Sequence, residues 1–166
     1  MSANPARPDN GFEMIQPPNT LRQKVGGSFA GIDAGALARA EAALKDLSSQ
    51  FGQWLQDEVG KLDAALHAVK VQGLSRETID ALYVRAHDLK GLGATYEFPI
   101  VTRIAGSLCR LLDNGDQRLR APMPLVDAHV NAIRAAVRDG IRDTDHPIGA
   151  ALSAELDRAV ADYLAR

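Results

Sequence analysis

The chain has 166 residues, the length of one ordinary domain, and can bury a core without disulfides or a structural metal. It carries 19 Lys and Arg against 21 Asp and Glu, a formal net charge of -2, so no long-range attraction to nucleic acid or an anionic membrane is expected. Hydrophobic residues make up 46% of the chain and aromatic residues only 5%, a composition that favours packed helices over a β-sandwich.

The N-terminal region differs in character from the rest of the chain. Residues 1 to about 31 contain four prolines and four glycines and show no sustained apolar periodicity. We expect a flexible extension over residues 1–31 and a helical domain over residues 32–166. No basic start with an apolar segment and no run of about 18 apolar residues is present, so neither a signal peptide nor a membrane span is predicted. Cys109 has no partner for an internal disulfide and is expected to be a small core residue, which adds to the prediction of a cytoplasmic protein.

The first predicted helix is long and amphipathic. Asp33 can serve as its N-cap, and from Ala34 to about Val69 apolar residues recur at helical spacings. We expect this stripe to face the core, with its two aromatic residues as core anchors. The stripe consists of Leu37, Leu44, Leu47, Phe51, Trp54, Leu55, Leu62, Leu66 and Val69.

Turn signals define the next two helices. Gly73 ends the long helix, and Ser75 can cap a second helix that runs to about Tyr96. Pro99 fits the first turn of a third helix, which the dipeptide Asn114-Gly115 stops.

Two further helices are predicted in the last third of the chain, from about 122 to 141 and from about 147 to 165. Consecutive helices joined by a few residues are expected to pack antiparallel. The expected fold class is therefore all-α, an antiparallel four-helix bundle with one additional helix and an irregular N-terminal extension.

The most informative segment lies inside the second predicted helix, over residues 86–94, and reads AHDLKGLGA. Each glycine in a helix interior costs roughly 1 kcal/mol relative to alanine, so two glycines one residue apart need a compensating reason. A projection at about 100° per residue separates two faces of this helix. The core face carries Leu82, Ala86, Leu89 and Gly93, and a different face carries Tyr83, His87, Lys90, Gly91 and Ala94.

This second face suits phosphoryl transfer. Neutral imidazole is nucleophilic near neutral pH, so one ring nitrogen of His87 can attack phosphorus while the other keeps its proton. Lys90 lies one turn further on and can approach negative oxygens bound to the ring, and Gly91 leaves the approach clear. Such catalysis depends mainly on positioning and cationic stabilisation.

The chain has no P-loop motif and no glycine-rich nucleotide loop after a strand, so no means of using ATP is visible. We therefore expect a phosphocarrier without kinase activity of its own, whose phosphoryl donor and acceptor are other proteins.

The segment resembles the signature of histidine-phosphotransfer (HPt) domains, H-x-L-K-G followed by small residues. It is matched at His87, Leu89, Lys90, Gly91 and Gly93. The resemblance implies a helical bundle in which His87 is the phosphorylated histidine, exposed in mid-helix. It also implies that Lys90 neutralises the phosphoryl group and that Gly91 keeps the approach clear.

The same resemblance implies the partners. These would be response-regulator receiver domains, together with a hybrid or sensor histidine kinase, in a multistep His-Asp phosphorelay. The receiver would bring the acceptor aspartate and Mg²⁺, so no cofactor or metal of the chain's own is expected. Neither nucleic acid nor a membrane is an expected partner, and a monomer is the default expectation.

Two positions depart from the family pattern. The family usually has a small hydroxyl residue after the glycine, where Leu92 stands, and a further glycine ten positions after the histidine, where Glu97 stands. The second departure affects the turn before Pro99 and not the chemistry at His87.

Two other functions remain open at this stage. The chain could be a helical adaptor that binds signalling partners without being phosphorylated. It could also be an unrelated enzyme with His87 as general base, which would require a nearby carboxylate and a concave pocket. Asp80 lies two turns before His87, too far for a direct hydrogen bond in an ideal helix.

The remaining histidines, His67, His129 and His146, fall on different elements and are interpreted as surface or helix-end residues, not as metal ligands. A set of arginines could form a basic rim beside His87, although a solvated face is the simpler interpretation. The set consists of Arg103, Arg110, Arg118 and Arg120.

Overall fold

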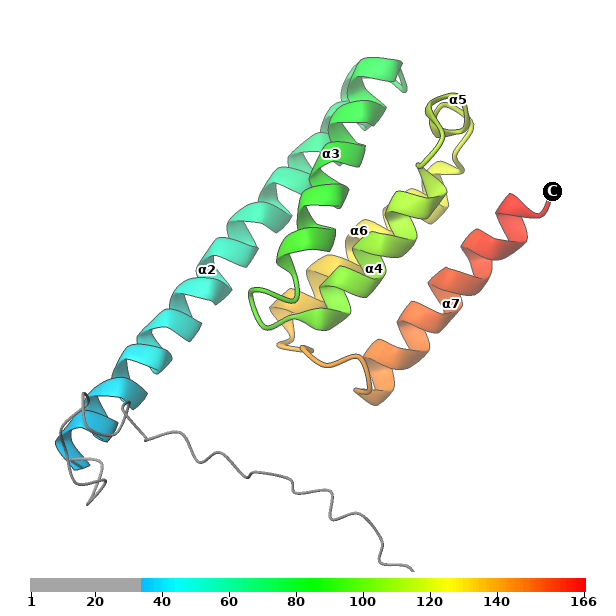
Figure 1. Cartoon of the computed structure of the whole chain (residues 1–166). Coiled ribbons are helices and arrows are strands. Elements are labelled where there is room, and N and C mark those ends of the chain that lie inside the picture. The colour runs from blue at the N-terminus through cyan, green and yellow to red at the C-terminus, as the bar shows by residue number, and fades with distance from the viewer. Residues whose placement is uncertain (1–33) are drawn as a thin grey trace, which may run out of the picture. The chain divides into compact units, whose positions relative to one another are not determined.

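The computed structural model describes residues 34–166, so the expected extension over residues 1–31 and the Asp33 cap lie outside the described residues. The chain divides into a unit of residues 1–40 and a unit of residues 41–166. The helices are α2 (Ala34–Gln72), α3 (Arg76–Leu92), α4 (Pro99–Leu111), α5 (Gly115–Arg118), α6 (Met123–Arg138) and α7 (Pro147–Leu164) (Figure 1).

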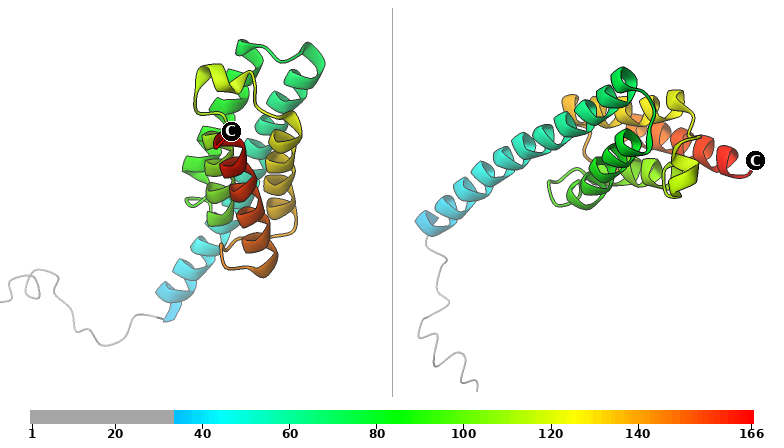
Figure 2. Two further views of the ribbon diagram at one scale, coloured as in Figure 1. Left: turned by 90° about the vertical axis from the view of Figure 1, so that its right-hand side faces the viewer. Right: turned by 90° about the horizontal axis from the view of Figure 1, so that it is seen from above.

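Residues 41–166 form an all-α bundle, which confirms the predicted fold class, and no strand occurs in the described part of the chain. Helices α3 and α4 form an antiparallel pair (Figure 1), and α4 also packs against α6 and α7. The views in Figure 2 place α7 on the outside of the α4–α6 pair as the additional helix.

Local sequence signals account for most helix ends. Gly73 adopts a φ of 94°, a conformation that favours glycine, and α2 ends just before it. Ser75 then caps α3 through a reciprocal pair of bonds. Its hydroxyl accepts from the Thr78 N–H at 3.2 Å, and the Thr78 hydroxyl accepts from the Ser75 N–H at 3.0 Å. Pro99 begins α4 and Pro147 begins α7, as the sequence predicts.

The turn between α3 and α4 explains why α3 ends at Leu92 and not near Tyr96. Glu97 has a φ of 63° in the left-handed region that favours glycine, and this is the position where the HPt pattern has glycine. The Glu97 carboxylate accepts hydrogen bonds from Arg142 at 2.8 Å and from Ser48 at 2.9 Å. These two contacts help to offset the backbone cost of a non-glycine residue at this position.

The short helix α5 is missing from the sequence prediction. Asn114-Gly115 was expected only to stop a helix, but the Asn114 side chain accepts from the Asp116 N–H at 3.1 Å and starts a new turn.

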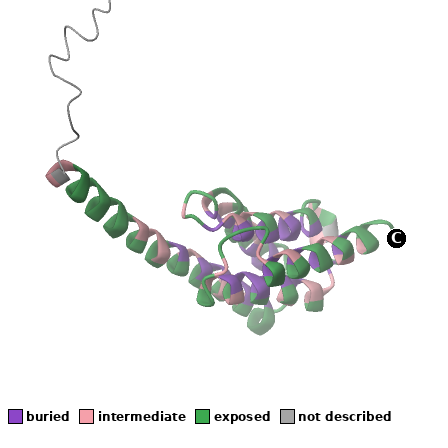
Figure 3. Ribbon diagram, turned by 90° about the horizontal axis from the view of Figure 1, so that it is seen from below, coloured by how far each residue is buried: buried purple, intermediate pink, exposed green. Residues whose placement is uncertain are grey.

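The buried stripe of α2 is shorter than predicted. Its core residues begin at Leu55, whereas Leu44 is 66% exposed and Trp54 is 43% exposed. Leu37 and Leu47 are exposed as well. The reason is length, because α2 has 39 residues while α3 and α6 have 17 and 16 and can cover less than half of it. Figure 3 shows the exposed N-terminal turns of α2 and the buried faces inside the bundle.

Candidate functional site

The two predicted faces of α3 are confirmed. Leu82, Ala86 and Leu89 have no exposed surface and point into the core. His87 and Lys90 are exposed on another face of the same helix. The core contacts therefore fix the rotation of α3 about its axis, and that rotation places the imidazole at the surface.

Gly91, in the last turn of α3, and Gly93, the C-cap that follows the helix, have different structural roles. A methyl group on Gly93 would lie 2.7 Å from both the backbone nitrogen and the hydroxyl oxygen of Thr102, so Gly93 allows α4 to approach closely. A methyl group on Gly91 would meet nothing within 4 Å. Internal packing therefore does not require glycine at position 91. Because glycine has no side chain, the surface one turn from His87 is left uncovered.

Lys90 is not engaged by the carboxylates that lie nearest to it along α3. Asp88 pairs with Arg85 at 3.3 Å, and Asp80 pairs with Arg118 at 2.7 Å. Among the described residues, neither Lys90 nor His87 makes a side-chain hydrogen bond or an ion pair. The ammonium group is thus available to a negative group attached to the imidazole. Within residues 34–166, no carboxylate orients the ring as a general base would require.

Tyr83 was assigned no role beyond its place on the His87 face, and Arg118 was considered only as part of a possible basic rim. The Tyr83 ring lies one turn before His87, with ring centroids 6.2 Å apart and an angle of 37° between the rings. Arg118 of α5 lies over the Tyr83 ring, with its guanidinium carbon 3.7 Å from the ring centroid. Helical spacing places Tyr83 on the His87 face, whereas no local signal predicts that Arg118, from a short helix further along the chain, reaches it.

The other arginines of the proposed rim lie elsewhere. Arg103 and Arg110 of α4 pair with Asp157 of α7, at 3.4 and 2.5 Å. The Arg120 carbonyl accepts a hydrogen bond from the Tyr163 hydroxyl at 2.9 Å. A continuous basic rim around His87 is therefore not formed by this set, and only Arg118 lies at the candidate site.

The prediction for His129 is wrong, because this residue is fully buried in α6 and does not lie at the surface. Its Nδ1 lies 2.7 Å from the Leu125 carbonyl oxygen and is placed to donate to it, while Nε2 is buried without a partner among the described residues. Burial lowers the pKa of His129, and the hydrogen bond to Leu125 opposes this effect only in part. His67 is exposed as predicted, and His146 is the residue before the first turn of α7.

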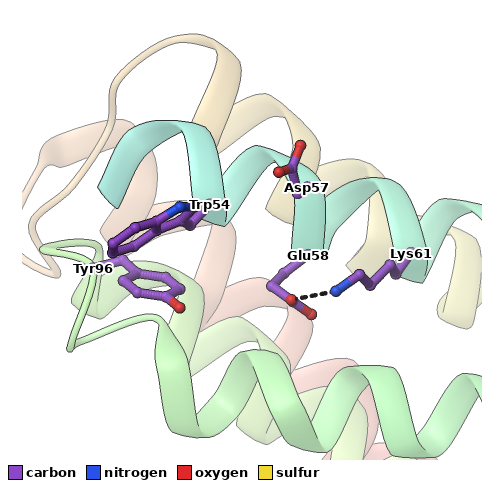
Figure 4. A pocket seen from close by; sticks show the side chains of 5 residues that line it. All are labelled: Trp54, Asp57, Glu58, Lys61 and Tyr96. Carbon is purple, nitrogen blue, oxygen red and sulfur yellow. Dashed lines mark hydrogen bonds and ion pairs between the residues drawn. The ribbon is translucent and has the colours of Figure 1, made fainter. Parts of the chain in front are cut away.

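A pocket between α2 and the turn that follows α3 is separate from the His87 face. It has a volume of about 450 Å³ and contains none of the candidate site residues (Figure 4). Its lining consists of Trp54, Asp57, Glu58, Lys61 and Tyr96.

The aromatic residues at this pocket correct a further prediction. The rings of Phe51, Trp54 and Tyr96 contact one another, with centroids 5.6 to 6.1 Å apart. Trp54 therefore belongs to a partly exposed aromatic cluster and is not a core anchor.

Comparison with known proteins identifies one family. The model of the Hpt domain matches residues 46–162, which is more than half of the chain. The match includes α3 through α6 and all but the last two residues of α7. Neither the curated proteins nor the solved structures contain a match to the chain. None of the helices in the described residues is long and apolar enough to span a membrane.

Proposed function

The chain belongs to the Hpt domain family, and on this premise we propose that it is a histidine-phosphotransfer protein that is phosphorylated on His87. Membership supports a phosphotransfer role in two-component systems in general. The finer assignment is that His87 accepts a phosphoryl group and passes it to or from an aspartate of a receiver domain.

One observation carries this assignment: an exposed imidazole on α3 shares its side of the helix with an open glycine and with an ammonium group that has no ion pair among the described residues. His87, Lys90 and Gly91 are all exposed, and Leu89 between them is buried. A partner protein can therefore reach the ring, while the core holds the helix that carries it.

The bonds formed and broken in the proposed transfer step are accounted for by His87 and the receiver, without a cofactor bound to this chain. A nitrogen of neutral His87 attacks the phosphorus of an aspartyl phosphate on the receiver, the P–N bond forms, and the P–O bond to the aspartate breaks. The aspartate leaves as a carboxylate, and the second ring nitrogen keeps its proton. Lys90 attracts the phosphoryl oxygens, whose charge is spread in the transition state. The reverse step returns the group to a receiver.

The proposed partners are receiver domains and a hybrid or sensor histidine kinase. Mg²⁺ would be held by the receiver, next to the aspartate that exchanges the phosphoryl group. We place the protein in the cytoplasm, because the free thiol of Cys109 is suited to a reducing compartment. We propose that the protein acts as a monomer.

The test is phosphoryl transfer from a panel of phosphorylated receiver domains with Mg²⁺, measured as acid-labile label on the full chain. His87→Gln is the test variant, and His67→Gln is its matched control, because His67 is also an exposed histidine on a helix. The proposal expects labelling of the wild type and of His67→Gln and no labelling of His87→Gln.

Equal labelling of all three proteins would overturn the assignment to His87. Absence of labelling from every receiver, combined with binding of a receiver, would favour the adaptor function instead. In that case His87→Ala would leave partner binding unchanged.

A further inference from the structure

We propose that Tyr83, held in place by Arg118, is a positioning residue for His87, so that the short helix α5 controls the orientation of the imidazole. This inference rests on the proposed function, because it concerns how the phosphorylated residue is presented. It assigns a role to two side chains outside the H-x-L-K-G segment.

The contact between Tyr83 and His87 limits the space open to the imidazole. Both residues lie on one side of α3 at a spacing of four, where side chains of a helix meet. Their ring centroids are 6.2 Å apart. Aromatic rings at such distances attract each other, so the contact favours one orientation of an otherwise exposed side chain. His87 has no hydrogen bond among the described residues that could do this instead.

Arg118 in turn fixes the Tyr83 ring. Its guanidinium carbon lies 3.7 Å from the ring centroid, and its side chain is only 15% exposed. The guanidinium donates to the Asp80 carboxylate at 2.7 Å, to the Leu112 carbonyl oxygen and, at 3.4 Å, to the Asp113 carbonyl oxygen. One side chain of α5 therefore joins α3 to the end of α4.

The contacts from Arg118 to Tyr83 and from Tyr83 to His87 affect how often the imidazole is correctly oriented for transfer. An in-line displacement requires the attacking nitrogen to point at phosphorus, and a side chain that samples several staggered rotamers spends part of its time misdirected. Tyr83 restricts that sampling before a receiver binds. Loss of the ring would therefore slow transfer while the bundle stays folded, because His87 and Lys90 themselves remain present.

The first measurement is the side-chain conformation of His87 in the full-length protein, from three-bond Hα–Hβ and N–Hβ couplings by NMR. We compare wild type with Tyr83→Phe, which keeps the ring, and Tyr83→Leu, which removes it. The matched control is Tyr96→Leu, which removes a tyrosine ring that packs on Phe51 and Trp54. The expected result is one dominant rotamer in the wild type, in Tyr83→Phe and in Tyr96→Leu, and averaged couplings in Tyr83→Leu. Averaged couplings in the wild type, or unchanged couplings in Tyr83→Leu, would overturn the proposal.

The second measurement is the rate of transfer from a phosphorylated receiver. If His87 samples several rotamers in Tyr83→Leu, the transfer rate of this variant should fall by about threefold to tenfold. The rate of Tyr83→Phe should stay close to that of the wild type. Arg118→Gln should also lower the transfer rate and should give averaged His87 couplings. If no variant and no wild type is labelled, the proposed function fails, yet the NMR comparison still decides whether Tyr83 positions the ring. Wild-type rates for Tyr83→Leu beside averaged couplings would refute the role in transfer.

Discussion

Single residues of α3 divide into those that hold the helix in the bundle and those that leave its outer side open. Gly91 and Gly93 make this division clear, because they are identical in type and only two positions apart. Gly93 is buried against Thr102, while Gly91 has open space above it. The nature of the neighbour, and not the residue type, decides what each glycine does.

The first prediction compares Gly93→Ala with Gly91→Ala. The added methyl group at position 93 would meet a backbone nitrogen at 2.7 Å, which cannot move without shifting α4, so we expect a loss of about 1–3 kcal/mol of unfolding free energy. Gly91→Ala should raise stability by roughly 0.5–1 kcal/mol, because alanine is the better helix former. Urea denaturation followed by circular dichroism measures both. Equal effects of the two substitutions would contradict the proposed division.

The second prediction concerns the charge of Lys90. Lys90→Ala should slow transfer from a phosphorylated receiver by roughly tenfold, because a cation near the phosphoryl oxygens is lost, with some screening by solvent at this exposed position. The midpoint of thermal unfolding should stay within a few degrees of wild type, since the ammonium group has no ion pair among the described residues. Lys61→Ala is a suitable control, as it removes an exposed lysine from α2. A fall in both rate and stability would instead indicate a structural role.

At the scale of helices, the sequence predicts boundaries well where a local signal sets them. The Ser75 cap and the prolines at positions 99 and 147 stand where the helices begin, because each acts on its own backbone. The exposed face of α3 is predictable for the same reason, because the spacing of Leu82, Ala86 and Leu89 determines which residues of the helix face solvent. The contacts that a helix makes depend on the length and position of the helices beside it. Local sequence patterns carry no information about these neighbours.

Three misjudged features illustrate this limit. The exposed start of α2 follows from the shorter helices beside it, and the contact of Arg118 with Tyr83 joins distant parts of the chain. His129 was interpreted as a surface or helix-end residue because the histidines fall on different elements and form no ligand cluster. Its spacing of three from buried Val126 and four from buried Ile133 is nevertheless a core spacing, and this signal could have found it.

The burial of His129 leads to the third prediction, a dependence of stability on pH. The pKa of His129 is lowered in the folded state, so below about pH 6.5 the unfolded chain binds a proton that the folded chain does not. Stability is therefore constant above that pH with respect to this group. It falls as the pH drops below 6.5, by at most about 1.4 kcal/mol per pH unit, until the folded histidine also titrates.

Urea denaturation between pH 7.5 and pH 5 measures this effect. His129→Leu should flatten the dependence, because the side chain no longer titrates, whereas His67→Gln should leave it as in the wild type, because His67 is exposed. An unchanged slope in His129→Leu would show that another group causes the loss.

At the scale of the whole molecule, one core joins α2, α3, α4, α6 and α7. Buried residues of α2, α3, α4, α6 and α7 belong to a single cluster, in which α4 contacts three of its neighbours. The surface that presents His87 is therefore maintained by the entire bundle and not by α3 alone. Loss of a core contact far from His87 should weaken the site only through global unfolding.

Cys109 offers a direct measure of this cooperativity and carries the last prediction. The thiol is free and buried in α4, and burial raises its pKa, so it should react slowly with a disulfide reagent at pH 8 in the native protein. Leu156→Ala in α7 removes a buried side chain from the same core and should lower the unfolding free energy by about 2–5 kcal/mol. If the bundle opens as one unit, the labelling rate of Cys109 should rise in proportion to the unfolded fraction measured by circular dichroism. Labelling that stays fast in the wild type, or that rises without a change in global stability, would mean that α7 opens separately from the helices that carry His87.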